Sequence, residues 1–319
     1  MPRFCLPIFF IACLAILCTG CGSPLAKNAM TPPGTSTESM RVDRDKRTYR
    51  LHIPAGYRHD APVPLVLVLH GAFSSAKKAE RFSGFSKVAD EHGFIVAYPN
   101  GRGLLGFLRH WNAGFCCGQA MRADWNDTGF LLQLIDDLSG ELAVDRKRVY
   151  LAGMSNGGML VHRFAAENPE QVAAITLVAA AAGARWADAE EMQAPPYPDS
   201  PVPALVIHAR DDPTIPFEGG RGSRADVEYL GPLDTVAFWR SANRCIQLPV
   251  EKKRLPGGDW TRWDNCLGGS EVALLALDQG GHAWPGEQID DSDEMESGPA
   301  GSVNASEAAW QFMSRFSLP

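Results

Sequence analysis

Continuous apolar runs alternate with amphipathic segments along most of this chain. The apolar runs have the length and composition of strands buried on both faces of a sheet, and they occupy residues 65–69, 94–98, 148–152, 173–178, 204–208 and 272–277. The segments with helical spacing cover residues 79–92, 129–142, 158–166, 233–243 and 305–316. This alternation predicts a single α/β domain with a doubly wound, mostly parallel sheet. Residues 50–53 and 250–263 are expected to add antiparallel strands at its edges.

Two helices carry boundary signals. Gly93 is expected to end the helix at residues 79–92, because glycine readily adopts the left-handed conformation found after helices. Asp127 is expected to cap the start of the helix at residues 129–142 with its carboxylate.

The N-terminus has the pattern of a bacterial export signal. Arg3 precedes an apolar segment, residues 4–17, that is too short to span a bilayer comfortably. The following Cys18-Thr19-Gly20-Cys21 resembles a lipobox with Cys21 as the lipid-bearing residue, although leucine usually stands where Cys18 does. Cleavage without lipidation is therefore the alternative. We predict a signal peptide over residues 1–20, a disordered tether over 21–40 and the folded domain over 41–319, in a secreted or lipid-anchored protein outside the cytoplasm.

The net charge narrows the possible binding partners. The formal net charge of −7 argues against nucleic acid or an anionic membrane surface as a partner, and leaves the lipid as the only expected membrane contact.

Four cysteines follow Cys21, and in an oxidising compartment they can pair in three ways. We favour a disulfide between Cys245 and Cys266, which leaves Cys116 and Cys117 as a vicinal bridge or two free thiols.

No motif for a cofactor is recognised, and no metal is expected. None of the four cysteines after Cys21 has the Cys-x-x-Cys spacing of a zinc site. Residues 287–296 contain six acidic side chains, but their spacing does not match a calcium-binding EF-hand loop. We interpret this segment as a solvated surface loop.

The most informative motif is Gly153-Met154-Ser155-Asn156-Gly157. It lies between a predicted strand and a predicted helix, which is the context of the nucleophile elbow in α/β hydrolases. The serine of such an elbow sits on a sharp turn, so side chains at Gly153 and Gly157 would collide with neighbouring backbone. The start of the helix behind Ser155 offers free N–H groups where an oxyanion would form.

A serine nucleophile needs a base and an acid that orients the base. In α/β hydrolases the acid and then the histidine follow the serine in the chain. Here Asp211 and Asp212 follow the predicted strand at 204–208, and His282 follows the last predicted strand. We prefer Asp212 as the acid, because Pro213 restricts its backbone, and leave Asp211 as a surface or capping residue.

Two backbone N–H groups are expected to form the oxyanion hole. One is the amide of Asn156, which follows the nucleophile. The other is expected after the strand at 65–69, where the sequence reads His70-Gly71-Ala72-Phe73. We choose the Ala72 amide, with Phe73 as the alternative, and expect a structural hydrogen-bonding role for His70.

Several motifs together resemble the polyhydroxybutyrate depolymerase/feruloyl esterase family of secreted hydrolases. They are Leu69-His70-Gly71, Tyr98-Pro99-Asn100-Gly101, Trp111-Asn112-Ala113-Gly114 with Cys116-Cys117-Gly118, the elbow motif extended to Met159, and Gly280-Gly281-His282-Ala283-Trp284-Pro285-Gly286. The resemblance implies a triad of Ser155, Asp212 and His282 and a Cys245–Cys266 disulfide. The chain departs from the family at residues 124–130 and at Ala209, which bears on substrate specificity.

Three tryptophans lie in segments expected near the site: Trp111, Trp125 and Trp284. They could form an apolar platform for an aromatic acyl group, with core packing as the alternative for each. The sequence therefore predicts a serine esterase acting on small or oligomeric esters such as feruloylated or acetylated oligosaccharides. A polyester depolymerase is the alternative with the same mechanism, and a catalytically silent binding protein of the envelope is the alternative of another class.

Overall fold

The computed structural model describes residues 32–42, 45–223, 226–246, 248–286 and 303–319. The predicted signal peptide, Cys21 and the acidic segment at 287–296 lie outside these ranges. Within them, no helix has both the length and the apolar character needed to cross a bilayer.

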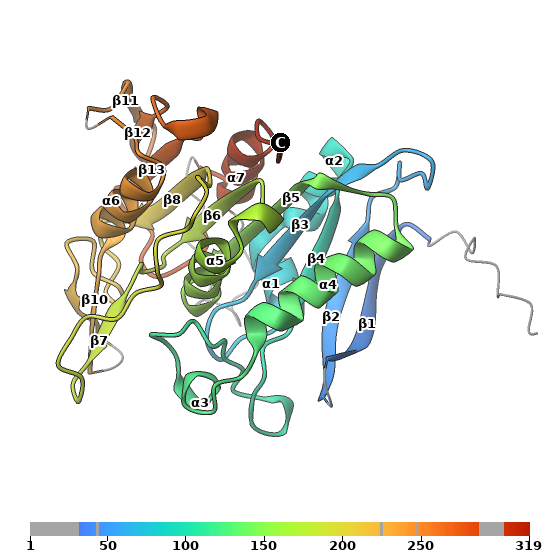
Figure 1. The fold of residues 1–319 in the computed structure, drawn as a ribbon, viewed down its shortest axis with the longest axis horizontal. Helices are drawn as coiled ribbons and strands as arrows, with labels where there is room; N and C mark the ends of the chain where they lie inside the picture. The colour runs from blue at the N-terminus through green and yellow to red at the C-terminus, as the bar shows by residue number, and fades with distance from the viewer. Residues whose placement is uncertain (1–31, 43–44, 224–225, 247, 287–302) are drawn as a thin grey trace, which may run out of the picture. The chain divides into compact units, whose positions relative to one another are not determined.

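Ten strands form one sheet, in which the central strands are parallel and both edges are antiparallel (Figure 1). The order across the sheet is β1 (Gly34–Val42), β2 (Asp45–Ile53), β4 (Ile95–Pro99), β3 (Val63–Leu69), β5 (Val144–Met154), β6 (Ala174–Val178), β8 (Ala204–Ala209), β13 (Val272–Leu277), β12 (Gly258–Trp263) and β11 (Glu251–Leu255). Strands β4 to β13 in this order run parallel, and β1, β2, β12 and β11 pair antiparallel. The predicted doubly wound sheet with antiparallel edges is confirmed.

Helices cover both faces of the sheet, which is why its central strands are apolar along most of their buried length. One core packs α4 (Asp127–Glu141), α5 (Asn156–Glu167) and α6 (Pro232–Ala242) against one face. The other packs α1 (Ala76–Ser83), α2 (Phe85–His92) and α7 (Ala305–Met313) against the opposite face. Alternate residues of β3 illustrate the division, since Leu65 and Leu67 belong to the first core and Val66 and Val68 to the second.

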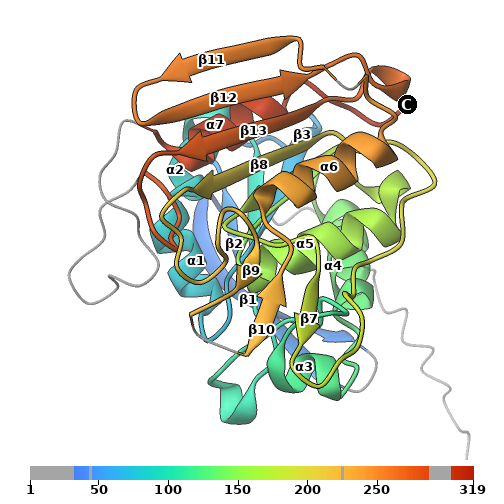
Figure 2. The same cartoon turned by 90° about the vertical axis from the view of Figure 1, so that its left-hand side faces the viewer.

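A second, three-stranded sheet was not predicted. It contains β7 (Ala184–Trp186), β10 (Val227–Tyr229) and β9 (Gly220–Arg221), in that order (Figure 2). Its strands have only two or three residues, too few to produce a recognisable alternation. A short helix, α3 (Gly118–Arg122), follows Cys117. Three 3₁₀ turns, at residues 104–106, 169–171 and 267–269, complete the described elements.

The predicted tether is wrong from residue 34 onward, because β1 occupies Gly34–Val42. It pairs along its whole length with β2, from Gly34 opposite Ile53 to Val42 opposite Asp45. An edge strand needs little apolar sequence, and most of β1 is exposed. Its Ser- and Thr-rich composition therefore looked like that of a linker.

Two predictions about helices also need correction. The helix expected at residues 79–92 is two helices, because Gly84 has a left-handed φ of 61° and ends α1 before α2 begins. The cap of α4 is Asn126, whose Oδ1 accepts the Gly129 N–H over 2.9 Å. Asp127 is instead buried in an ion pair with Arg47 over 2.8 Å, and its other oxygen accepts the Asn112 N–H.

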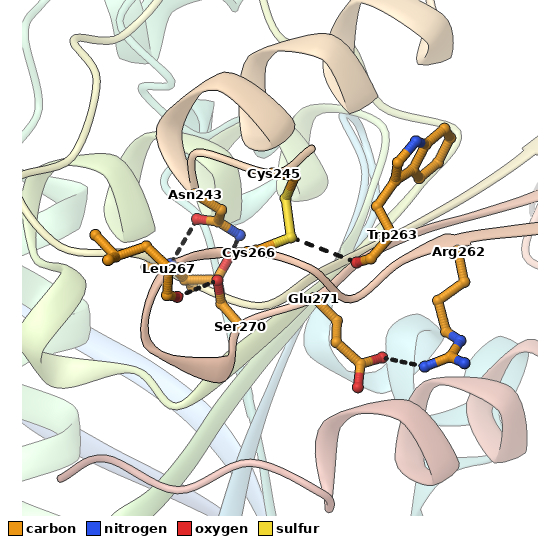
Figure 3. The surroundings of a disulfide bond; sticks show 9 residues. Asn243, Cys245, Arg262, Trp263, Cys266, Leu267, Ser270 and Glu271 are labelled. Atoms are coloured by element: carbon orange, nitrogen blue, oxygen red, sulfur yellow. Dashed lines mark hydrogen bonds and ion pairs between the residues drawn. A yellow bond between two sulfur atoms is a disulfide. The ribbon is translucent and has the colours of Figure 1, made fainter. Parts of the chain in front are cut away.

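The disulfide expected between Cys245 and Cys266 agrees with the structure, which places the two Sγ atoms at bonding distance, 2.04 Å (Figure 3). It ties the residues after α6 to the turn after β12. Beside it, the Leu267 N–H donates to the Asn243 carbonyl over 2.8 Å, so backbone and sulfur atoms join the same two segments. The sulfur atoms of Cys116 and Cys117 are adjacent, and the vicinal bridge stays a prediction beside the alternative of two free thiols.

Candidate active site

Ser155 lies on the sharp turn predicted for a nucleophile elbow. It joins β5 to α5 with a φ of 52°, a left-handed value that is unusual for a residue with a side chain. A Cβ atom added at Gly153 would stand 2.6 Å from the Gly157 carbonyl carbon, and one at Gly157 would stand 2.3 Å from the His70 oxygen. The steric reason for both glycines is confirmed.

Ser155, His282 and Asp212 form a continuous hydrogen-bonded chain. Ser155 Oγ lies 2.9 Å from His282 Nε2, and His282 Nδ1 lies 2.8 Å from Asp212 Oδ2. The three residues follow the carboxyl ends of β5, β13 and β8, which lie at the same edge of the parallel sheet. This arrangement can take a proton from the serine hydroxyl and stabilise the imidazolium that results.

The Asp212 carboxylate is almost fully buried, and it has three hydrogen-bond partners and a fourth neighbour, His208. Its Oδ1 accepts the N–H groups of Thr214 and Ile215 over 2.8 and 3.0 Å, and its Oδ2 faces His282 and His208. Burial by itself would raise the pKa of Asp212, but the hydrogen bonds from His208 and His282 outweigh it and hold the pKa below its usual range. Asp212 is therefore ionised at neutral pH.

Asp211, the other candidate acid, does not contact the imidazole. Its Oδ1 accepts the N–H of Gly281 over 2.9 Å, so it caps the loop that carries His282. The geometry accordingly favours Asp212 as the acid and agrees with the capping role expected for Asp211.

His208 is a neighbour of the acid that the sequence did not single out. It is fully buried, and its Nε2 lies 2.9 Å from the Ile215 carbonyl and 3.3 Å from Asp212 Oδ2. A carbonyl only accepts, so Nε2 carries the proton. His208 is the last but one residue of β8, and this position at a strand end was the available signal.

The amides chosen for the oxyanion hole both border the pocket above Ser155. Ala72 and Asn156 line it, and neither N–H has an acceptor among the described residues. The alternative donor, Phe73, is excluded because its N–H already donates to the Arg109 carbonyl over 2.7 Å. The Asn156 side chain pairs with both backbone groups of Trp111, which fixes the start of α5.

His70 orients the loop that carries Ala72. Gly101 donates to its Nε2 over 3.0 Å, so Nδ1 carries the proton and donates to the Gly71 carbonyl over 2.7 Å. In a trans peptide the carbonyl of Gly71 and the N–H of Ala72 point in opposite directions, so this bond turns the Ala72 N–H away from His70. Burial lowers the pKa of His70 to about 3, and the ring stays neutral.

The pocket above Ser155 encloses about 250 Å³. Its larger side chains are Trp186, Tyr229, Met154, Met159, Ile215, Phe73 and His110. Among the described residues, no Asp, Glu, Lys or Arg lines it. The cavity therefore suits an uncharged, apolar group next to the serine.

The predicted tryptophan platform is wrong in its members. Trp111 is fully buried, and its indole N–H donates to the His70 carbonyl. Trp284 is fully buried in the opposite core, and Trp125, partly buried beneath the Arg102 guanidinium at 4.4 Å, does not line the pocket. The tryptophan that does line it is Trp186 of β7, held by a hydrogen bond to the Phe115 carbonyl over 2.8 Å.

One cluster elsewhere has the composition of a metal site. The possible ligand atoms of Glu91, His92 and Glu307 lie within 4.8 Å of one another at the surface where α2 meets α7. None of these residues lines the pocket above Ser155.

Comparison with known proteins agrees with this geometry. The family model "Esterase PHB depolymerase" matches residues 47–193. "Putative esterase NocK" from Nocardia uniformis subsp. tsuyamanensis is 31% identical over 287 residues, covering 83% of this chain and 78% of that protein. Feruloyl esterase B from Piromyces equi is 27% identical over 270 residues, covering 83% of this chain and 44% of that protein.

Solved structures support the fold. Acetyl xylan esterase from Aspergillus awamori superposes with a TM-score of 0.53 at 12% identity, covering 77% of this chain and 94% of that chain. At such low identity the likeness concerns the fold alone, which is the α/β-hydrolase fold. With the match to NocK and the family model over the segment that contains the elbow, the chain belongs to the esterase family described as Esterase PHB depolymerase.

Proposed function

We propose that this protein hydrolyses carboxylic esters through an acyl-enzyme on Ser155. The observation that carries the proposal is the chain of hydrogen bonds from Ser155 Oγ through His282 to Asp212. Membership of an esterase family supports the same reaction class.

The reaction follows from the position of each group. Ser155 Oγ attacks the ester carbonyl while His282 Nε2 takes the hydroxyl proton, and the negative charge develops on the carbonyl oxygen near the Ala72 and Asn156 amides. The carbon–oxygen bond to the alcohol then breaks, and the imidazolium returns the proton to the leaving alkoxide. Water, deprotonated by His282, attacks the acyl-enzyme and releases the acid and the free serine.

The pocket supports an uncharged acyl group of aromatic size. Its volume of about 250 Å³ and the aromatic side chains of Trp186 and Tyr229 in its lining suit a planar ring, such as that of a feruloyl ester of an oligosaccharide. The similarity to feruloyl esterase B agrees with this class, and an acetyl ester would leave most of the cavity unfilled.

A polyester substrate is the second candidate, favoured by exposed apolar side chains at the pocket and in the segment that precedes His110. Phe73 lines the pocket and is 59% exposed, and its ring contacts His110 at 4.5 Å. Phe107 and Leu108, just before His110, are 71% and 55% exposed. Poly(3-hydroxyalkanoate) depolymerase C from Paucimonas lemoignei is 30% identical over 202 residues, covering 63% of this chain and 45% of that protein.

We further propose that the protein works outside the cytoplasm, secreted or attached through a lipid on Cys21. The support is the apolar segment and the lipobox-like sequence near the N-terminus. The disulfide between Cys245 and Cys266 agrees with an oxidising compartment. Expression of Cys21→Ser tests the lipid, because this variant should move from the membrane fraction to the soluble fraction.

Labelling with a fluorophosphonate probe tests the reaction. We expect the wild-type protein to be labelled and Ser155→Ala to lose both labelling and esterase activity. A catalytically silent binding protein would give no labelling, and activity retained by Ser155→Ala would refute the assignment. Kinetics with matched feruloyl, acetyl and 3-hydroxybutyrate esters, and with suspended polyester, then distinguish the two substrate classes.

A further inference from the structure

The loop that carries His282 is held firmly on one side of this residue. Trp284, two residues later, is fully buried, and its indole N–H donates to Ser306 Oγ over 3.1 Å. On the other side stand Gly280 and Gly281, with φ values of +154° and +60°. Consecutive glycines have large conformational freedom and no side chains to pack. The placement of the imidazole therefore depends on what holds this glycine pair.

Asp211 is the side chain that holds it. Its Oδ1 accepts the N–H of Gly281, the residue directly before His282, over 2.9 Å. Among the described residues, no cation forms an ion pair with the Asp211 carboxylate. The carboxylate can therefore accept the hydrogen bond from the Gly281 N–H without competition from a paired cation.

The sheet brings the two loops together. Strands β8 and β13 are parallel neighbours, with Ala209 opposite Leu277, and the Arg210 N–H donates to the Leu277 carbonyl over 2.9 Å. The loops that follow β8 and β13 therefore begin next to each other. The loop from β8 supplies Asp211 and Asp212, and the loop from β13 supplies the residues that they contact.

We propose that Asp211 is a positioning residue for catalysis. The two adjacent carboxylates hold one loop at two points: Asp212 holds the imidazole ring of His282, and Asp211 holds the backbone just before it. This inference rests on the proposed function, because it assigns a role within the same triad. Reaction rates depend steeply on such placement, since a displacement of about 1 Å can cost about a hundredfold.

Asp211 is suited to a test by substitution because it is exposed, so truncating it creates no cavity in the core. Asp211→Ala removes the acceptor, whereas Asp211→Asn keeps an oxygen acceptor and removes only the charge. Asp278 provides a matched control, because it is an acidic residue at the start of the same loop and pairs with Arg254 instead of with the loop backbone. We would measure kcat and KM on a soluble aryl ester and the rate of fluorophosphonate labelling, alongside Ser155→Ala.

We expect Asp211→Ala to lower kcat and the labelling rate by about tenfold with little change in KM, part of the full cost of misplacement. Asp211→Asn should stay within about threefold of the wild-type protein, because an amide oxygen replaces the acceptor, and Asp278→Ala should leave kcat unchanged. The inference is overturned if Asp211→Ala keeps its kcat, or if Asp211→Asn or Asp278→Ala loses as much as Asp211→Ala. Full activity in Ser155→Ala would instead refute the proposed function.

Discussion

Acid should destabilise this protein through two buried histidines, and His162 allows the effect to be measured away from the active site. His162 is fully buried in α5, and its ring lies edge-on to Phe238 and Trp239. The Ala182 carbonyl is close enough to interact with the ring, but no hydrogen bond of ordinary geometry forms. Burial lowers the pKa of His162 to about 3 and that of His70 to about 3.

The direction of the pH effect on stability depends on whether the folded or the unfolded chain binds protons at the higher pH. With a folded pKa below the unfolded value of about 6.5, each histidine is protonated first in the unfolded chain. The contribution of these two histidines to the free energy of unfolding is therefore fully present above about pH 6.5 and is lost as the pH drops toward 3. At pH 5, about 1.5 pH units below 6.5, each histidine lowers the free energy of unfolding by about 2 kcal/mol, because one unit corresponds to about 1.4 kcal/mol. His70 and His162 together cost about 4 kcal/mol.

Replacing His162 by Phe keeps an aromatic ring and removes the titrating group. Urea unfolding at pH 7.5 and pH 5.0 should show a loss of stability about 2 kcal/mol smaller in His162→Phe than in the wild-type protein. Phe238→Leu is the matched control, because it disturbs the same packing without removing a titrating group and should keep the wild-type pH dependence. An identical pH dependence in His162→Phe and the wild-type protein would refute the reasoning.

Three further outcomes are expected. Trp186→Ala should lower kcat/KM for feruloyl esters by about tenfold and leave acetyl esters within about twofold, since only the larger acyl group reaches the indole; equal losses on both would contradict this. Asp212→Asn should lower kcat by on the order of 10³–10⁴-fold, measured by steady-state kinetics, because the amide no longer favours the required tautomer of His282. The double variant Cys245→Ser/Cys266→Ser should lose about 3 kcal/mol in urea unfolding, from the 21-residue separation of the cysteines, and keep its kcat.

The sequence by itself determined the layered architecture and the chain order of the candidate catalytic residues. Buried strands have to be apolar on both faces, so β3 and β13 stood out from their composition. The nucleophile elbow was also predictable from a short stretch of sequence, because backbone crowding around Ser155 leaves room only for glycine at residues 153 and 157.

Tertiary structure alone decided which side chains meet. Trp111, Trp284 and Trp186 are alike as residues, but of these three only Trp186 lines the pocket. It lies on β7, which pairs with β10, the strand that brings Tyr229 to the same pocket. The different contacts of Asp211 and Asp212 likewise follow only from the fold, because their partners, Gly281 and His282, lie seventy positions along the chain. Local patterns record the secondary structure and turns of a segment, whereas these contacts depend on how distant loops leave neighbouring strands.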